Sequence, residues 1–287
     1  MGLACHSREP GHAGCPYFLT MNTIEPMSVF FERSWISFPH DPLLATWIEH
    51  ALPLARQAVS APENAEWLRC GGTWFVGVNA LPNTPDGAVP GGPKLAGLAT
   101  DFVEKVLHMG HLNLDRAQIS VCYPGYPRKS EGESDAAFRF RRDKDAAHLD
   151  GLLPEGPDRR RHLREYHGYV LGIPLVSSDA AAAPFVVWEG SHEIMRDAFA
   201  AMFEGIPAED WGDLDVTTRY QAARKKVFET CRRVEFATKP GEAYLLHRLA
   251  IHGVGPWEET AQAGPDGRMI AYFRPENARK EEWLSAP

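Results

Sequence analysis

The sequence has no long uninterrupted apolar segment. Its longest apolar run is nine residues, from Ala180 to Trp188, and this run contains Pro184. A helix that crosses a bilayer needs roughly 20 predominantly apolar residues. The first twenty residues are polar and interrupted by proline and glycine, so they lack the apolar core of a secretory signal. We therefore expect no membrane partner, and we predict a cytoplasmic location.

Cysteine is also scarce, with five residues spread over a chain of 287. Disulfide frameworks are denser and belong mainly to small secreted domains, so we expect free thiols in a reducing compartment. Cys5 and Cys15 flank two histidines, His6 and His12, but their spacing matches no zinc module. We predict that residues 1–26 form a flexible leader.

The chain also has fewer basic than acidic residues. The chain has 30 basic and 38 acidic residues, which gives a net charge of −8 with histidine neutral. Nucleic-acid-binding domains are usually basic, so this balance argues against a nucleic-acid partner. Apolar residues make up 44 % of the chain, enough to bury a substantial core. No boundary between domains is evident, and we expect one domain over residues 27–287.

Helical patterns are present in three parts of the sequence. In the segment from Asp41 to Ser60, Asp41 can cap the helix and Pro42 occupies the first helical position, where proline is tolerated. A second amphipathic pattern runs from Lys94 to Met109, so residues 27–116 are expected to hold the N-terminal helices, while Glu66 to Asn79 looks extended. Residues 194–231 contain further helical patterns. We interpret them as an insertion that forms a lid or a subunit contact, which leaves a homo-oligomer open.

From Ala117 onward, short strand patterns alternate with turns. The stretch from Leu152 to Glu165 interrupts them and is expected to be irregular. The predicted strands are Gln118–Tyr123, Ala136–Arg141, Tyr166–Val176, Pro184–Trp188, Val234–Ala237, Glu242–Leu246 and Arg268–Phe273. Two leading helices followed by many strands predict a mainly β protein with flanking helices, a barrel or jelly roll.

The first chemical motif is His148-Leu149-Asp150. In an extended segment His148 and Asp150 point to the same side, so an imidazole and a carboxylate can bind one divalent metal ion. His252 follows about a hundred residues later, within a glycine-containing segment, and can supply a third ligand. Two histidines and one carboxylate on one face of a metal are typical of non-haem Fe(II) oxygenases. His247 is the alternative to His252, but residues five apart on a strand face opposite sides.

Arg268 lies sixteen positions after His252 and opens a predicted strand. Its planar guanidinium can hold a carboxylate through two parallel hydrogen bonds. A dicarboxylate that chelates the metal at one end requires such an anchor at its other end.

With these residues in order, the sequence resembles the phytanoyl-CoA dioxygenase-like family of Fe(II)/2-oxoglutarate-dependent oxygenases. The segment from Pro184 to His192, which ends in Gly-Ser-His, resembles a strand and turn of that family. The similarity covers roughly residues 117–275. It implies a double-stranded β-helix, or cupin-like jelly roll, with His148, Asp150 and His252 as catalytic iron ligands and Arg268 as the 2-oxoglutarate anchor.

The implied reaction consumes O₂, decarboxylates 2-oxoglutarate to succinate, and hydroxylates or desaturates a small or medium organic substrate. Related halogenases lack the carboxylate ligand, so Asp150 favours hydroxylation or desaturation. Two features depart from the family. Val254 stands where a small hydroxyl residue is common, and an insertion separates His252 from Arg268. Arg274 is a second choice for the anchor.

Two further readings remain open at the level of sequence. One is a cupin-like metalloenzyme that does not use 2-oxoglutarate, and the other is a non-catalytic jelly-roll binding protein. The basic run after the metal motif is usually a solvated face. As the functional alternative, Arg160 and Arg161 would lie in a lid that binds an anionic group of the substrate.

Overall fold

The computed structural model describes residues 24–110 and 113–286. The cysteine and histidine residues of the predicted leader, Cys5 to Cys15, lie outside the described residues. Helix α1 (Ile24–Arg33) is the first described element. Among the described residues, no helix is long and apolar enough to cross a membrane.

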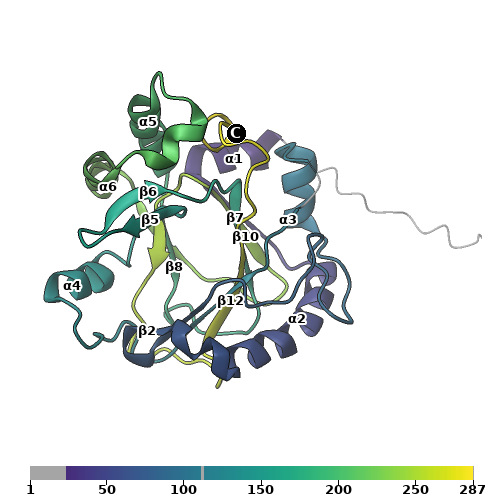
Figure 1. The fold of residues 1–287 in the computed structure, drawn as a ribbon. Coiled ribbons are helices and arrows are strands. Elements are labelled where there is room, and N and C mark those ends of the chain that lie inside the picture. Colours follow the sequence, from purple (N-terminus) through teal and green to yellow (C-terminus); the bar gives the residue numbers. More distant parts are fainter. Residues whose placement is uncertain (1–23, 111–112, 287) are drawn as a thin grey trace, which may run out of the picture.

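Two antiparallel sheets make up the centre of the molecule (Figure 1). The larger sheet has the strand order β1-β10-β7-β12-β4-β3-β2, and the smaller has the order β11-β8-β9. The larger sheet consists of β1 (Trp35–Phe38), β2 (Leu68–Arg69), β3 (Trp74–Gly77), β4 (Gln118–Cys122), β7 (Tyr169–Pro174), β10 (Ala243–His247) and β12 (Arg268–Phe273). The smaller sheet consists of β8 (Phe185–Trp188), β9 (Arg233–Phe236) and β11 (His252–Val254). The predicted mainly β architecture with flanking helices is confirmed.

Alternation along the strands decides which side chains lie between the sheets. On β12, Met269, Ala271 and Phe273 join the core beneath the helices, while Ile270 and Tyr272 join the layer shared with β8. Side chains two apart on a strand share a face. Arg268 therefore starts β12 on the face of Tyr272, which is the face between the sheets.

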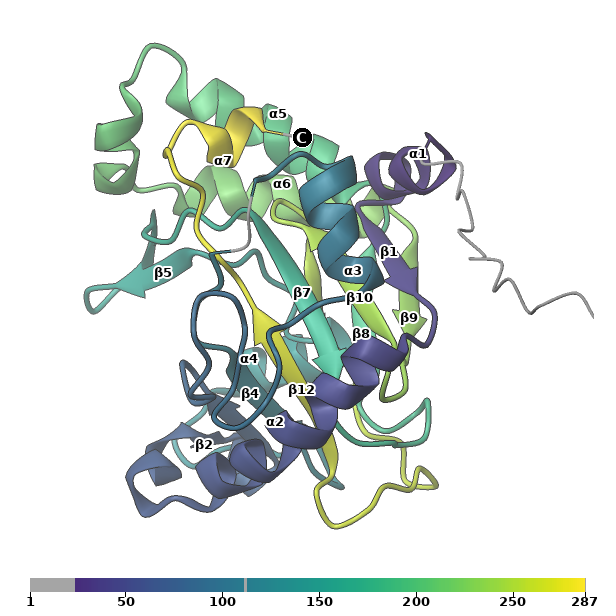
Figure 2. The same cartoon turned by 90° about the vertical axis from the view of Figure 1, so that its right-hand side faces the viewer.

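Helices cover the outer face of the larger sheet (Figure 2). Helix α2 (Pro42–Ser60) buries Trp47 and Ala51 against this sheet. Its first turn is capped as predicted, because the Asp41 carboxylate accepts a hydrogen bond from the backbone N of Leu43 at 2.8 Å. The predicted helix from Lys94 begins instead at Leu98, as α3 (Leu98–Asp101), and continues as a π-helix over Phe102–Val106.

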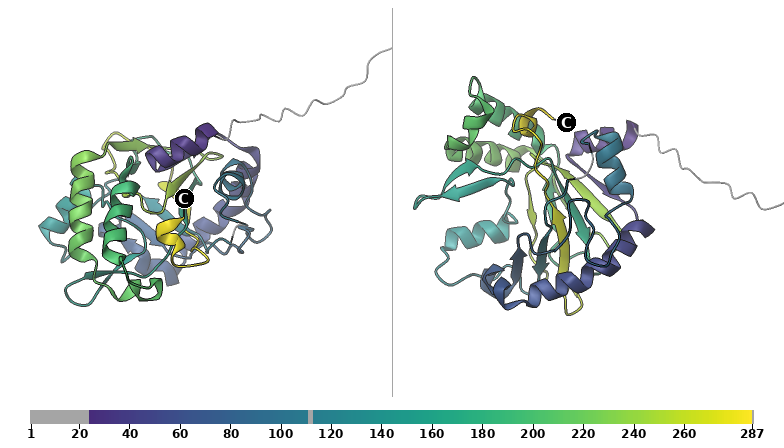
Figure 3. Two further views of the ribbon diagram at one scale, coloured as in Figure 1. Left: turned by 90° about the horizontal axis from the view of Figure 1, so that it is seen from above. Right: turned by 45° about the vertical axis from the view of Figure 1, so that its right-hand side comes forward.

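A second helical layer covers the smaller sheet and is seen from above in Figure 3. It consists of α5 (Ser191–Phe203), α6 (Thr217–Thr230) and the short C-terminal α7 (Glu282–Ser285). Residues 194–231 are therefore largely helical, as predicted. Whether they form a lid or a subunit contact stays a prediction.

Two expectations about local structure were wrong. Residues 136–141 are not a strand but part of α4 (Asp135–Asp143), because the Ser134 hydroxyl caps the helix by accepting a hydrogen bond from the backbone N of Ala137. Residues 152–165 are not irregular. They form a hairpin of β5 (Leu152–Glu155) and β6 (Arg160–Leu163), which projects with α4 on the side away from α2 and α3 (Figures 1 and 3).

A buried histidine at the end of β10 lies against helix α5. His247 is 1 % exposed, and its Nε2 lies 2.9 Å from the Arg196 guanidinium, which can only donate. Its ring also lies 4.8 Å, centroid to centroid, from that of His192. Burial, with the nearby positive groups Arg248 and Arg196, lowers the pKa of His247 well below its ordinary value. The ring is therefore neutral in the folded protein at neutral pH.

We expect acid to destabilise the fold partly through His247. The unfolded chain binds a proton at His247 near its ordinary pKa, whereas the folded chain does not, so stability is complete above that pKa and falls as pH drops below it. In the variant His247→Gln, the unfolding free energy should fall less between pH 7 and pH 5 than in the wild type. Urea unfolding at several pH values measures this, with the exposed His108→Gln as the matched control. An identical pH dependence in wild type and His247→Gln would contradict the assignment.

Candidate metal centre

The structure brings together three of the residues singled out in the sequence. Among the described residues, His148, Asp150 and His252 form a group whose candidate ligand atoms all lie within 4.8 Å of one another. The Nε2 atom of His148 lies 3.3 Å from Asp150 Oδ1, and that of His252 lies 3.6 Å from Asp150 Oδ2. The two imidazole rings are 4.7 Å apart, centroid to centroid.

A short antiparallel bridge sets this geometry. The backbone N of His148 donates to the His252 carbonyl at 2.9 Å, and the backbone N of His252 donates back to the His148 carbonyl at 3.1 Å. Residues that exchange both hydrogen bonds lie directly opposite each other, with their side chains on the same face. The bridge therefore places two histidines from distant parts of the chain beside one another.

Packing around the bridge requires a very small residue at position 253. A Cβ atom on Gly253 would lie 2.1 Å from the carbonyl oxygen of Asp145, closer than real contacts allow. The same Asp145 carbonyl accepts a hydrogen bond from the backbone N of Val254 at 2.9 Å. Both oxygens of the Asp145 carboxylate accept hydrogen bonds at 2.7 Å from Arg233 of β9. The loop that leads to His148 is thus fixed to the smaller sheet.

Hydrogen bonds also orient the two imidazoles. The Nδ1 atoms of His148 and His252 each lie 2.9 Å from a backbone carbonyl, of Ala146 and Ala250 respectively. A carbonyl only accepts, so each Nδ1 carries the proton and each Nε2 presents its lone pair. Ligating histidines are commonly oriented by a hydrogen bond of this kind. The donor set therefore fits a divalent first-row metal ion.

The charge state of Asp150 also suits a metal ligand. Burial raises the pKa of this carboxyl group, but His252, Arg274 and two hydrogen bonds together hold it well below its usual range. For His252, burial lowers the pKa and the Asp150 carboxylate raises it by more, so the pKa lies above its ordinary value. The carboxylate is ionised at neutral pH and available to a cation.

The triad faces a cavity between the two sheets. Its wall is formed by residues of both sheets and of the loop that carries His148. Besides the triad it is lined by Trp74, Gln118, Ser120, Val170, Phe185, Gly253, Val254, Tyr272 and Arg274. The Phe185 ring stacks on His252, with centroids 5.6 Å apart and planes at 15°. The sequence analysis missed Tyr272, Gln118 and Ser120, which alternate inward on neighbouring strands.

Arg268 is buried between the sheets beside Tyr272. It is 6 % exposed, its NH2 group lies 3.5 Å from the Tyr272 hydroxyl, and its buried NH1 group has no hydrogen-bond partner among the described residues. Its other polar neighbours are Tyr244 and Cys122. Burial raises the pKa of the Cys122 thiol to about 12 and that of Tyr244 well above its usual value, so both are neutral at neutral pH. No carboxylate of the described residues pairs with Arg268.

The other sequence-predicted groups lie elsewhere. Arg160 pairs with Asp215 at 2.5 Å, and Arg161 donates to the Leu152 carbonyl at 2.9 Å. Neither arginine lines the triad cavity, and a role for them in substrate binding stays a prediction. His247 points toward Arg196, so His252 rather than His247 joins the triad.

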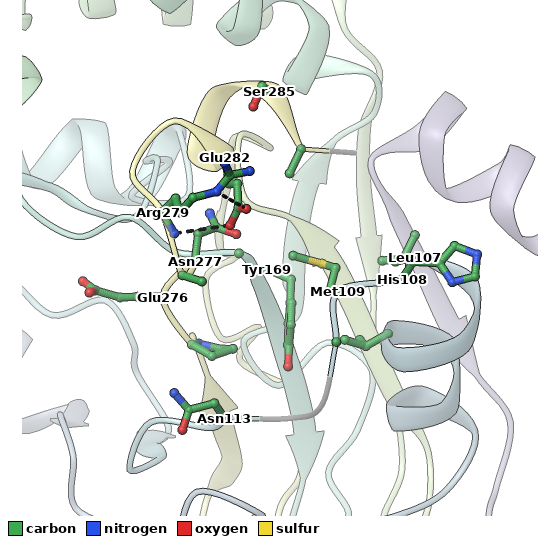
Figure 4. A pocket seen from close by; sticks show the side chains of 16 residues that line it. Leu107, His108, Met109, Asn113, Tyr169, Glu276, Asn277, Arg279, Glu282 and Ser285 are labelled. Carbon is green, nitrogen blue, oxygen red and sulfur yellow. Dashed lines mark hydrogen bonds and ion pairs between the residues drawn. The ribbon is translucent and has the colours of Figure 1, made fainter. Parts of the chain in front are cut away.

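A larger cavity, of about 800 Å³, lies on another part of the molecule (Figure 4). It is formed where the π-helix and the segment after it approach the start of β7 and the C-terminal segment, with Met109, Tyr169 and Asn277 in its wall. Among the described residues that line it, Arg279 is the one arginine, and it is paired with Glu282 at 2.9 Å. The three candidate metal ligands lie outside this cavity, so we place the candidate site at the triad.

No family model matches the chain, and a search of curated proteins gives no match. Solved structures give matches of low similarity. The epimerase SnoN in complex with Fe³⁺, alpha ketoglutarate and nogalamycin RO is 14 % identical, with a TM-score of 0.45 over 88 % of this chain and 82 % of that chain. EctD from S. alaskensis in its apoform is 15 % identical, with a TM-score of 0.45 over 87 % and 75 %. AviO1 from Streptomyces viridochromogenes Tue57 is 11 % identical, with a TM-score of 0.44 over 93 % and 98 %.

We expect the variant Asp150→Ala to lose metal binding without unfolding. Removing the anionic ligand leaves two neutral imidazoles, so the dissociation constant for Co(II) should rise by more than about 100-fold. Anaerobic titration monitored by the visible spectrum of Co(II) measures the constant. Asp143→Ala, at an exposed position of α4, is the matched control. Wild-type affinity in Asp150→Ala would refute the triad as a metal site.

Proposed function

We propose that this protein is an Fe(II)- and 2-oxoglutarate-dependent dioxygenase of the phytanoyl-CoA dioxygenase-like family that hydroxylates or desaturates a small or medium organic substrate. The observation that carries the proposal is the convergence of two imidazole Nε2 atoms and one ionised carboxylate beside a cavity. The two antiparallel sheets, with an apolar layer between them, support a double-stranded β-helix as the fold.

His148, Asp150 and His252 would hold the iron. Three protein ligands on one face leave coordination positions for a chelating co-substrate and for oxygen. When bound, Fe(II) would activate O₂, which is the oxidant, while 2-oxoglutarate is oxidised to succinate and carbon dioxide together with the organic substrate. The protein supplies the orientation of the ligands, through the backbone bridge and the two Nδ1 hydrogen bonds.

Arg268 would bind the distal carboxylate of 2-oxoglutarate. Its guanidinium is buried among neutral groups, and a buried charge without a counter-ion is unfavourable. A carboxylate would supply the missing charge and accept from the unpartnered NH1 group. The Tyr272 hydroxyl, which lies both beside Arg268 and in the triad cavity, links the two groups.

The wall of the cavity suits a reaction from which water is kept away. Trp74, Phe185 and Val254 contribute apolar surface beside the triad. An apolar wall limits the access of water to a reactive centre. Val254 stands where a hydroxyl contact to 2-oxoglutarate was expected, so Ser120 and Tyr272 are the hydroxyl groups of this cavity available for that contact.

The two alternative readings each leave one feature unexplained. In a cupin-like metalloenzyme that does not bind 2-oxoglutarate, the unpaired buried charge of Arg268 would have no ligand to neutralise it. A non-catalytic binding protein has no use for three ligand groups that are oriented toward one point. The single domain over residues 27–287, the small-molecule substrate and the cytoplasmic location remain part of the proposal.

We expect Arg268→Met to separate ligand binding from stability. Methionine fills much of the same space without a charge, and replacing a buried charge by an apolar side chain is often neutral or stabilising. The unfolding temperature should therefore stay the same or rise. The dissociation constant for 2-oxoglutarate should rise by about 100-fold or more, because two charge-assisted hydrogen bonds are lost.

The visible band of the Fe(II)–2-oxoglutarate chelate, titrated without oxygen, measures that binding, and succinate formed after oxygen is added measures turnover. Arg142→Met, at an exposed position, is the control. Unchanged affinity in Arg268→Met would remove Arg268 from the site. A wild-type protein that forms no chelate band would sink the proposed function as a whole.

A further inference from the structure

Arg274 is a charged group of the cavity wall to which the proposed function gives no role. It follows β12 directly and shares the inward face of Arg268 and Tyr272. Its NH1 group lies 3.7 Å from Asp150 Oδ1, which is an ion-pair distance but longer than a hydrogen bond. The side chain is 17 % exposed, so it lies largely within the protein beside the triad.

The hydrogen-bonding capacity of this guanidinium is largely unused. Its Nε atom is buried and has no hydrogen-bond partner among the described residues. An arginine carries five N–H donors in a planar fork that matches a carboxylate or a phosphate. A buried donor without a partner is costly, so its presence in a cavity wall points to a ligand that supplies the acceptor.

The backbone of Arg274 is fixed on both sides. Its N donates to Asp115 Oδ1 at 2.7 Å, and its carbonyl accepts from His167 Nδ1 at 2.7 Å. The other ring nitrogen of His167 lies 3.0 Å from Glu165 Oε2. The nearby acidic groups thus already have partners: Asp115 holds the backbone, Glu165 pairs with His167, and Asp150 would bind the metal.

The balance of charge in the loaded site supports the same reading. Counted over Arg268 and the groups that line the cavity, without the flanking Asp115 and Glu165, a divalent metal ion and the two guanidiniums outweigh the Asp150 carboxylate and a dianionic keto acid by one positive charge. Apart from Asp150, the residues that line the cavity include no acidic side chain. An anionic group on the substrate would neutralise this excess where water is partly excluded.

We propose that Arg274 binds a carboxylate or phosphate group of the primary substrate, so that the enzyme selects anionic substrates. This inference rests on the proposed function, because it assumes that the triad holds a metal and that Arg268 holds the keto acid. An anion on the free N–H groups of Arg274 lies next to the Asp150 ligand. The carbon atoms attached to that anion are thereby brought to the metal centre.

The experiment uses matched probes. Benzoate is compared with benzamide, which has the same shape without the charge, and phenyl phosphate is compared with phenol. Each is titrated without oxygen into protein loaded with Fe(II) and 2-oxoglutarate, and the shift of the chelate band gives its dissociation constant. If benzoate binds more tightly than benzamide, the substrate group is a carboxylate. If phenyl phosphate binds more tightly than phenol, it is a phosphate.

We expect one anion to bind at least about tenfold more tightly than its neutral partner in the wild type. Arg274→Gln should abolish this preference and Arg274→Lys should retain part of it, while Arg142→Gln leaves it unchanged. The dissociation constants for Co(II) and for 2-oxoglutarate should be the same in all of these variants. A preference that persists in Arg274→Gln would mean that the anion binds the metal directly, and it would overturn the proposal.

Two other outcomes would also overturn it. Weaker Co(II) binding in Arg274→Gln would mean that Arg274 positions Asp150, and weaker 2-oxoglutarate binding would mean that it holds the keto acid. Equal binding of charged and neutral probes by the wild type would show that no anion is selected. Because each arm starts from wild-type protein with a visible chelate band, absence of that band is recognised separately as failure of the proposed function.

Discussion

Two reciprocal backbone hydrogen bonds between His148 and His252 are the constraint on which the site depends. They join a loop to the first residue of β11, about a hundred positions further along the chain. The bridge, the close packing at Gly253 and the Asp145–Arg233 ion pair fix the backbone positions of both histidines. A site that is assembled in this way loses little conformational entropy when it takes up an ion.

The inner face of β12 and the residue after it place two positively charged side chains near the triad. Arg268, Tyr272 and Arg274 follow one another on this face because side chains two positions apart share a side of a strand. One guanidinium lies among neutral groups, and the other lies beside the Asp150 carboxylate. The strand and the residue that follows it thus supply two positive positions, which are separated along the strand direction.

Much of this could be predicted from the sequence, for reasons that are local or periodic. Asp41 as the capping residue and Pro42 as the first helical residue predict the start of α2. The strand β12 was predicted with the same bounds that the structure shows. A strand was predicted over residues 136–141 because the residues from Phe138 to Arg141 alternate in polarity. The prediction was wrong because the Ser134 cap starts a helix there. Contacts between residues far apart in the sequence could not be predicted from it. The pairing of Arg160 with Asp215, and the contact of Arg274 with Asp150, depend on packing that no local pattern encodes.

The unpaired charge of Arg268 has a consequence for the life of the protein in a cell. A ligand that binds only the native state adds to stability in proportion to the logarithm of its concentration over its dissociation constant. A chain whose interior carries a cation in need of a counter-ion is therefore easier to unfold when that ligand is scarce. If Arg268 binds the keto acid as proposed, the abundance of this protein would follow the supply of that acid, because proteases remove unfolded chains.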